Sequence, residues 1–148
     1  MLRPANIMVP TDFSEYSDKA LRQALDIGKQ YGARVCLLHV IHEWIPLGAV
    51  EFPLSCYMEG QFKNEVAAEA EENLKKQVAK FPQAKEVGLT TCVKYGIPDV
   101  AILEEERERG IDLIVIASLG RSGIAKYLIG SVARNVLKGA KCPVLLTK

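Results

Sequence analysis

The sequence of 148 residues has little net charge, little histidine and no long hydrophobic run. Its 19 lysines and arginines are balanced by 18 acidic residues, so the basic excess that binds a nucleic-acid backbone is absent. The apolar stretches are too short to cross a bilayer. The first residues lack the apolar run and small-residue cleavage site of a signal peptide. We therefore expect a cytoplasmic protein that binds neither nucleic acid nor membrane.

Cysteine and histidine are too few and too scattered to predict a metal site. The four cysteines include no CxxC pair, and the two histidines are His39 and His42. Cys36, Cys92 and Cys142 each adjoin apolar, strand-like residues. We expect these three to serve as small hydrophobic side chains, and we predict no cluster of metal ligands supplied by the protein itself.

The chain does contain a regular alternation of strand-like and helix-like segments. Short apolar runs predict strands at residues 6–10, 33–41, 87–95, 112–118 and 143–147. Helical spacing of apolar residues, with Ser14 and Gly32 as end signals for the first helix, predicts helices at 14–32, 62–80, 98–110 and 129–138. Residues 42–59 have no clear period and are predicted to form a long loop. This order predicts one α/β domain over residues 1–148, with a mainly parallel sheet and helices on both faces.

A glycine-containing loop at residues 117–131 follows the most apolar of the predicted strands. Its glycines let backbone N–H groups approach a ligand. Gly130 and Ser131 open the next helix, whose positive dipole end suits a phosphate. From residue 113 onward the chain has six basic residues and no acidic one, which also favours an anion. Glycines in such a place are equally often plain turn formers, so the loop alone leaves both interpretations open.

The loop carries none of the common nucleotide or hydrolase motifs. It has neither the GxxxxGK[ST] run of P-loop proteins nor the GxGxxG run of dinucleotide-binding proteins. Its GRSG run is not a GxSxG nucleophile elbow, and no histidine follows to serve Ser122 or Ser131. A P-loop hydrolase and a serine hydrolase are therefore excluded.

Several short motifs, in this order and spacing, resemble the universal stress protein family over essentially the whole chain. They are IMVPTDFS at 7–14, LLHV at 37–40, GIP at 96–98, DLIV at 112–115, GSV at 130–132 and CPVLL at 142–146. The resemblance implies an open, twisted, five-stranded parallel sheet in strand order 3-2-1-4-5, Rossmann-like and similar to the adenine nucleotide alpha hydrolases. It also implies homodimers that pair the last strand of each subunit, here Pro143 to Thr147. Without a partner, that apolar edge strand would promote aggregation.

The family's nucleotide-binding members carry a glycine, two residues, a second glycine, nine residues, and then a glycine followed by Ser or Thr. In this chain Gly120, Gly130 and Ser131 match that pattern, and Ala117 stands in place of the first glycine. A strand-like backbone at Ala117 would tolerate the methyl group. A left-handed backbone there would cost on the order of 1 kcal/mol, and a collision of the methyl group with the ligand could cost more.

By position, the resemblance implies contacts to an adenine nucleotide at three strand ends. Asp12 would bind the ribose hydroxyls, and Val40 would meet the adenine through its backbone. Pro10 and Thr11 would shape the end of the first strand. Gly120, Gly130 and Ser131 would bind the phosphates, with Arg121 and Ser122 nearby, and Ala117 would lie beside the ribose or the phosphates. Two simpler roles remain open, since Asp12 can act as an acid at a helix N-terminus and Ser131 as a helix N-cap.

The resemblance implies a stress-response regulator that binds ATP, which Mg²⁺ or Mn²⁺ could accompany. Two alternatives stay open. The first is an interaction protein of the same family that binds no nucleotide, which the alanine at position 117 favours. The second is a slow ATPase, for which Asp12 is the only carboxylate near the predicted phosphate site that could act as a general base. We predict no catalytic residue.

Overall fold

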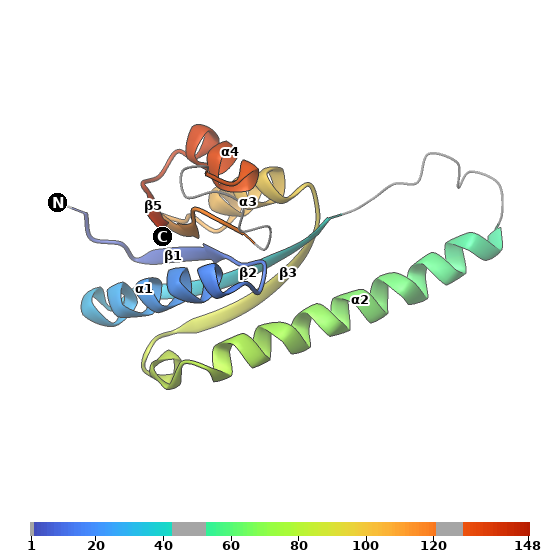
Figure 1. Ribbon diagram of the computed structural model, residues 1–148, viewed down its shortest axis with the longest axis horizontal. Helices are drawn as coiled ribbons and strands as arrows, with labels where there is room; N and C mark the ends of the chain where they lie inside the picture. Colours follow the sequence, from blue (N-terminus) through green and yellow to red (C-terminus); the bar gives the residue numbers. More distant parts are fainter. Residues whose placement is uncertain (1, 43–52, 121–128) are drawn as a thin grey trace.

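The computed structural model describes residues 2–42, 53–120 and 129–148, with the side chains of the helix that begins at Pro53 described from residue 60. Five parallel strands form one sheet in the order β3-β2-β1-β4-β5 (Figure 1). The strands are β1 (Asn6–Pro10), β2 (Arg34–His42), β3 (Leu89–Gly96), β4 (Leu113–Ala117) and β5 (Val144–Thr147). The helices are α1 (Glu15–Tyr31), α2 (Pro53–Ala79), the 3₁₀ helix η1 (Pro82–Glu86), α3 (Pro98–Glu108) and α4 (Ser131–Gly139). The α/β class and the strand order 3-2-1-4-5 are thereby confirmed.

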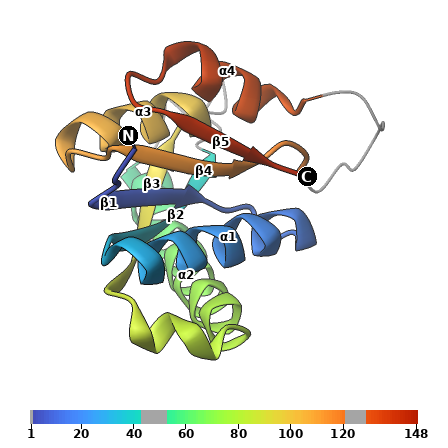
Figure 2. The ribbon, with the colours of Figure 1, turned by 90° about the vertical axis from the view of Figure 1, so that its left-hand side faces the viewer.

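Helices cover both faces of the sheet, with α1 and α2 on one side and α3 and α4 on the other (Figure 2). Alternate residues of the central strand β1 serve the two layers: Ile7 and Val9 pack with α1 and α2, whereas Met8 packs with α3 and α4. All three side chains are fully buried, and each contributes about 1.5–3 kcal/mol to folding. Burial on both faces explains why residues 7–10 of β1 are all apolar instead of alternating with polar ones.

The predicted ends of α1 are confirmed. Ser14 is the N-cap, and its side chain accepts a hydrogen bond from the N–H group of Ser17. Gly32 ends the helix at φ 67°, in the left-handed region that favours glycine. Only four residues thus separate the end of β1 from the start of the helix, which places its N-terminus beside the carboxyl end of that strand.

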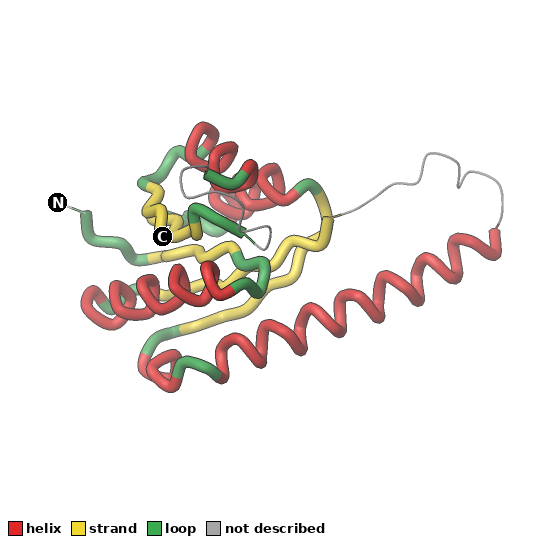
Figure 3. The backbone as a smooth tube through the Cα atoms, viewed as in Figure 1, coloured by secondary structure: helices red, strands yellow, loops and turns green. Residues whose placement is uncertain are grey.

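The predicted loop at residues 42–59 is wrong at both ends. His42 is the last residue of β2, and α2 begins at Pro53, where proline suits the first turn of a helix; residues 43–52 lie outside the described residues. The 27 residues of α2 span about 40 Å, whereas the eight residues of β3 span about 26 Å. The N-terminal half of α2 therefore runs past the sheet (Figure 3). Phe62, predicted to lie on the buried face of this helix, is 66% exposed.

The other predicted boundaries need smaller corrections. The 3₁₀ helix η1 takes up residues that follow α2, so β3 begins at Leu89 and not at residue 87. Helix α4 begins at Ser131 and not at residue 129. Cys36 is buried, and Cys92 and Cys142 are half-buried, all as free thiols, in agreement with their predicted role. Across residues 2–42, 53–120 and 129–148, no helix is long and apolar enough to span a membrane.

A buried carboxylate on α3 holds the segment that leads into β5. Glu106 is 4% exposed. One of its oxygens accepts hydrogen bonds from the backbone N–H groups of Lys141 and Cys142, each at 2.8 Å. Burial, together with the neighbouring Glu106 carboxylate, raises the pKa of the Cys142 thiol to about 12. Glu106 therefore fixes the start of the edge strand β5.

The neighbouring residue on α3, Glu105, ties this helix to the other edge strand. Glu105 is buried and forms ion pairs with Lys94 of β3, at 2.9 Å, and with Arg109. Burial alone would raise the pKa of Glu105, but its hydrogen bonds and ion pairs with the two cations outweigh burial and hold the pKa below its usual value of 4.5. The folded state therefore favours the ionised carboxylate.

Candidate functional site

A pocket of about 390 Å³ opens at the carboxyl ends of β1 and β4. In the sheet order, β2 and β3 lie on one side of β1, and β4 and β5 lie on the other. The connections therefore leave β1 and β4 in opposite directions, and ligands of open α/β sheets bind in the crevice this creates. The pocket brings together eight of the ten predicted site residues: Pro10, Thr11, Asp12, Val40, Ala117, Gly120, Gly130 and Ser131. Arg121 and Ser122 lie outside the described residues.

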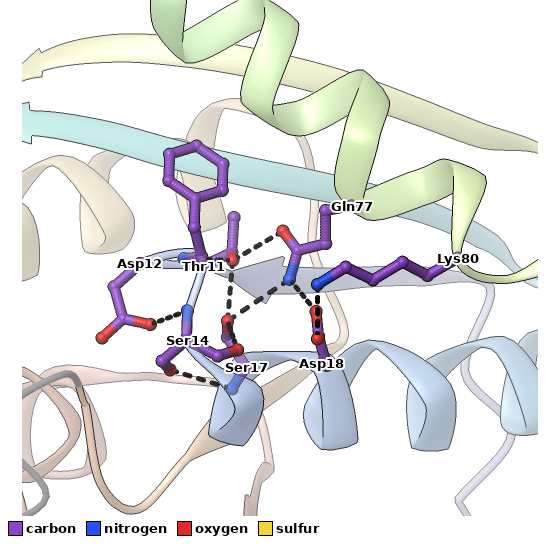
Figure 4. A network of polar contacts seen from close by, with 8 residues as sticks. Thr11, Asp12, Ser14, Ser17, Asp18, Gln77 and Lys80 are labelled. Atoms are coloured by element: carbon purple, nitrogen blue, oxygen red, sulfur yellow. Dashed lines mark hydrogen bonds and ion pairs between the residues drawn. The ribbon is translucent and has the colours of Figure 1, made fainter.

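The turn between β1 and α1 presents Asp12 to this pocket. The Thr11 hydroxyl oxygen accepts a hydrogen bond from the N–H group of Phe13 at 3.0 Å. The Asp12 carboxylate accepts one from the N–H group of Ser14, also at 3.0 Å (Figure 4). Phe13 has φ 66°, the only positive φ of a residue other than glycine in the described chain. Side-chain hydrogen bonds of this kind stabilise tight turns, and here they support a conformation that most residues avoid.

His39 holds the same turn from the adjacent strand. Its Nδ1 atom lies 2.8 Å from the carbonyl oxygen of Thr11, so Nδ1 carries the proton and donates it to that oxygen. Its ring centroid lies 4.3 Å from that of Phe13. The structural, hydrogen-bonded role expected of a histidine near a strand end is consistent with this geometry, although His39 also lines the pocket.

Gly120 lies directly against the carboxylate of Asp12. A Cβ atom added at Gly120 would approach Asp12 Oδ2 to 2.7 Å, closer than real Cβ atoms come to a neighbour. The φ of Gly120 does not require glycine. The missing side chain therefore makes room for Asp12, and the two residues form one wall of the pocket.

The opposite wall is the N-terminus of α4. Gly130 is the N-cap, at φ −54° and ψ 152°, and its N–H group donates to the carbonyl oxygen of Ser118 at 2.7 Å. Ser131 is the first helical residue and not the N-cap, so the N-cap interpretation of Ser131 is wrong. In the described part of the chain no side chain caps this helix. The N–H groups of its first turn lack intrahelical acceptors and carry the positive end of the helix dipole.

Ala117 occupies an ordinary strand position. It is the last residue of β4, pairs with Thr147, and does not have a positive φ. It is 8% exposed and packs in the core cluster beneath α1. The backbone condition under which alanine is tolerated at this position is therefore met.

Comparison with known proteins identifies the family. A model of the universal stress protein family matches residues 5–148. The chain belongs to the universal stress protein family. A universal stress protein of Methanocaldococcus jannaschii is 32% identical over 146 residues, covering 96% of this chain and 81% of that protein.

Solved universal stress proteins share the fold. UspA from Lactobacillus plantarum superposes with a TM-score of 0.81 at 25% identity, and each chain is covered completely. A universal stress protein from Archaeoglobus fulgidus, solved in complex with dAMP, superposes with a TM-score of 0.68 at 24% identity. That comparison covers 99% of this chain and 100% of the other.

Sequence reasoning missed part of this universal stress protein pocket. Pro98 and Ile102 of α3 line it, as does Ser118. From sequence alone, the GIP motif at residues 96–98 supports the family resemblance but is not among the predicted site residues. Its place after β3, at the same edge of the sheet as Asp12 and Val40, was the available signal. Of the side chains that the structure describes, no three from His, Cys, Asp and Glu are grouped to hold a metal ion.

Proposed function

We propose that this pocket binds an adenine nucleotide such as ATP and that the protein is a nucleotide-responsive stress regulator. The observation that carries the proposal is the pairing of a carboxylate wall with a helix N-terminus across one cavity at the strand-order reversal. The volume of about 390 Å³ lies within the range of about 300–1,000 Å³ that is usual for small-molecule sites.

The two walls suit opposite ends of a nucleotide. Asp12 is an acceptor-only group when ionised, so it would accept hydrogen bonds from the ribose hydroxyls. Gly130 and Ser131 lie where α4 presents backbone N–H donors, which would hold the phosphates. Val40 would meet the adenine at the end of β2. Pro10 and Thr11 would form the floor, while Gly120 leaves room for the carboxylate.

Two further predicted phosphate contacts, Arg121 and Ser122, remain proposals based on the family pattern. The alanine at position 117 is compatible with the proposal, because its backbone is strand-like and its side chain is largely buried. The dAMP complex of the Archaeoglobus fulgidus protein supports an adenine nucleotide as the ligand to test first.

The first experiment is to denature freshly purified protein and analyse the released small molecules. The emptied protein is then titrated with ATP, ADP and AMP, each with and without Mg²⁺. Released adenine nucleotide or saturable binding supports the proposal. Absence of both overturns it and favours the interaction protein that binds no nucleotide. Release of ADP from bound ATP over hours would instead indicate the slow ATPase.

A matched pair of variants locates the site. Asp12→Ala removes the proposed ribose acceptor, whereas Glu15→Ala removes an exposed acid on the first turn of α1. We expect Asp12→Ala to weaken nucleotide binding by about tenfold or more, because a hydrogen bond to a charged group contributes about 1.5–3 kcal/mol. Equal affinities of the two variants would place the nucleotide elsewhere.

We also propose that the protein forms a homodimer through β5. This strand pairs with β4 on one side only and is the last strand of the sheet. Leu145, in the middle of β5, is 37% exposed. An exposed apolar edge strand pairs readily with another strand, and a lysine blocks such pairing. Light scattering after gel filtration should give a dimer for the wild type and a monomer for Leu145→Lys; a monomeric wild type would refute this interface.

A further inference from the structure

One polar side chain of α2 is buried under the pocket turn. Gln77 is 2% exposed, although most of the face that α2 turns to the core is apolar, as at Ala70 and Leu74. A buried amide needs hydrogen-bond partners, and the side chain of Gln77 has three of them.

The hydrogen bonds of Gln77 determine its orientation. The Asp18 carboxylate lies 2.9 Å from Nε2, and since a carboxylate accepts only, this atom must be the amide nitrogen. The second N–H of the amide points to the Ser17 hydroxyl oxygen at 3.3 Å. The carbonyl oxygen Oε1 then accepts from the Thr11 hydroxyl at 2.8 Å (Figure 4). Both donors and the acceptor of the amide are used.

The Thr11 hydroxyl links Gln77 by hydrogen bonds to the turn that carries Asp12. Its single proton is directed to Gln77, which leaves its lone pairs for the N–H group of Phe13 at 3.0 Å. Phe13 is the residue with φ 66°. The Ser17 hydroxyl supports the same turn, because it donates to the carbonyl oxygen of Ser14 at 2.7 Å. The turn is thus held from α1 and, through Gln77, from α2, which begins 39 residues after Ser14.

We propose that Gln77 is a positioning residue that holds Asp12 in its ligand-binding orientation by fixing the Thr11–Ser14 turn. The inference rests on the proposed function, because it assigns to Asp12 the ribose contact described above. The inference adds that α2 sets the affinity of the pocket, although none of its residues from 60 to 79, whose side chains the structure describes, lines the pocket.

The test is a double-mutant cycle read by nucleotide titration. Gln77→Met keeps the length of the side chain but removes its three hydrogen bonds. We expect it to weaken adenine-nucleotide binding by about fivefold to tenfold, the scale of one or two lost hydrogen bonds. In an Asp12→Ala background the same substitution should have no further effect, since its influence would pass through Asp12.

Leu74→Ala is the matched control. Leu74 lies three residues before Gln77 on α2 and is fully packed, but it donates and accepts no side-chain hydrogen bond. Its truncation loosens the packing of α2 but removes none of the hydrogen bonds that hold the turn. We expect a lower melting temperature and an unchanged nucleotide affinity. An equal loss of affinity in Leu74→Ala and Gln77→Met would overturn the inference, because the effect would then be one of general packing.

A second measurement needs no ligand. The amide protons of Phe13 and Ser14 are held by Thr11 and Asp12, so their hydrogen exchange in Gln77→Met should be faster than in the wild type and in Leu74→Ala. Unchanged exchange, or wild-type affinity in Gln77→Met, would overturn the inference and leave the proposed function standing. If the wild type bound no adenine nucleotide, the proposed function and the inference would fail together.

Discussion

Removing the carboxylate of Glu106 should lower the free energy of unfolding more than the loss of most single side chains does. In Glu106→Ala the N–H groups of Lys141 and Cys142 lose their shared acceptor in a half-buried segment. A hydrogen bond to a charged group contributes about 1.5–3 kcal/mol, and two bonds to one atom are not additive. We expect a loss of about 3 kcal/mol in the free energy of unfolding, since the truncation also leaves a void.

Urea denaturation followed by circular dichroism measures this change, and the melting temperature should fall by about 6–12 °C. Glu106→Gln keeps an acceptor oxygen without the charge and should lose only about 1 kcal/mol. Glu104→Ala, an exposed residue on the same helix, should stay within about 0.5 kcal/mol of the wild type. If Glu106→Ala behaved like Glu104→Ala, the assigned role of this carboxylate would be refuted.

Three further predictions concern the pocket wall and two titrating groups. Gly120→Ala should lower the free energy of unfolding by about 1 kcal/mol, because its Cβ would displace the Asp12 carboxylate; urea denaturation measures it. Gly60→Ala, at an exposed helical position where nothing lies within 4 Å of the added Cβ, should not lower it. The lowered pKa of Glu105 makes a stability contribution that is present above the unfolded-state pKa and lost as the pH falls through the folded-state pKa, so Glu105→Gln should flatten the acid limb of a stability-against-pH curve. The raised pKa of Cys142 makes a contribution that is complete below about pH 9 and lost as the pH rises toward about 12, a decline that Cys142→Ala should reduce.

A different experimental result would contradict each of these three predictions. The destabilisation by Gly120→Ala should disappear in an Asp12→Ala background, and its persistence there would contradict the steric explanation. An acid limb of unchanged slope in Glu105→Gln would mean that its ion pairs contribute nothing to acid stability. An alkaline limb of unchanged slope in Cys142→Ala would mean that the half-buried Cys142 thiol contributes nothing to the loss of stability at high pH.

Much of the fold was predictable because the central strands β1 and β4 are buried on both faces. Residues 7–10 are apolar whichever way the side chains point, so neither register nor sheet order is needed to recognise β1. The caps of α1 were predictable for a local reason as well, since Ser14 and Gly32 satisfy helix ends through their own chemistry.

The first turns of α2 were not predictable in the same way. The helical spacing of apolar residues arises from the contacts that a helix makes with the core. The exposed stretch around Phe62 makes few such contacts. Proline at residue 53 and glycine at residue 60 then resemble loop residues, although the helix accommodates both. The C-terminal half of α2, which does cover the sheet, carries the expected spacing at Ala70 and Leu74.

The candidate site was predictable to the extent that it follows strand ends. Asp12 and Val40 lie where parallel strands finish, and that edge of the sheet can be located from sequence order alone. Gln77 could not be found in this way. A polar residue on an amphipathic helix is normally assigned to the solvent side, and only the three-dimensional arrangement reveals Thr11 opposite it.

The pairing of β1 with β4 has a consequence for the order of folding. Leu113 pairs with Ile7, 106 positions earlier in the chain, whereas β1, β2 and η1 can assemble from the first 90 residues. The closure of so long a loop is slow relative to local contacts. The pocket lies at the carboxyl ends of both β1 and β4, and its second wall is the N-terminus of α4. It therefore does not exist in a chain that has folded only its N-terminal half. A nucleotide added during refolding would therefore stabilise the finished protein and leave the rate of the early steps unchanged.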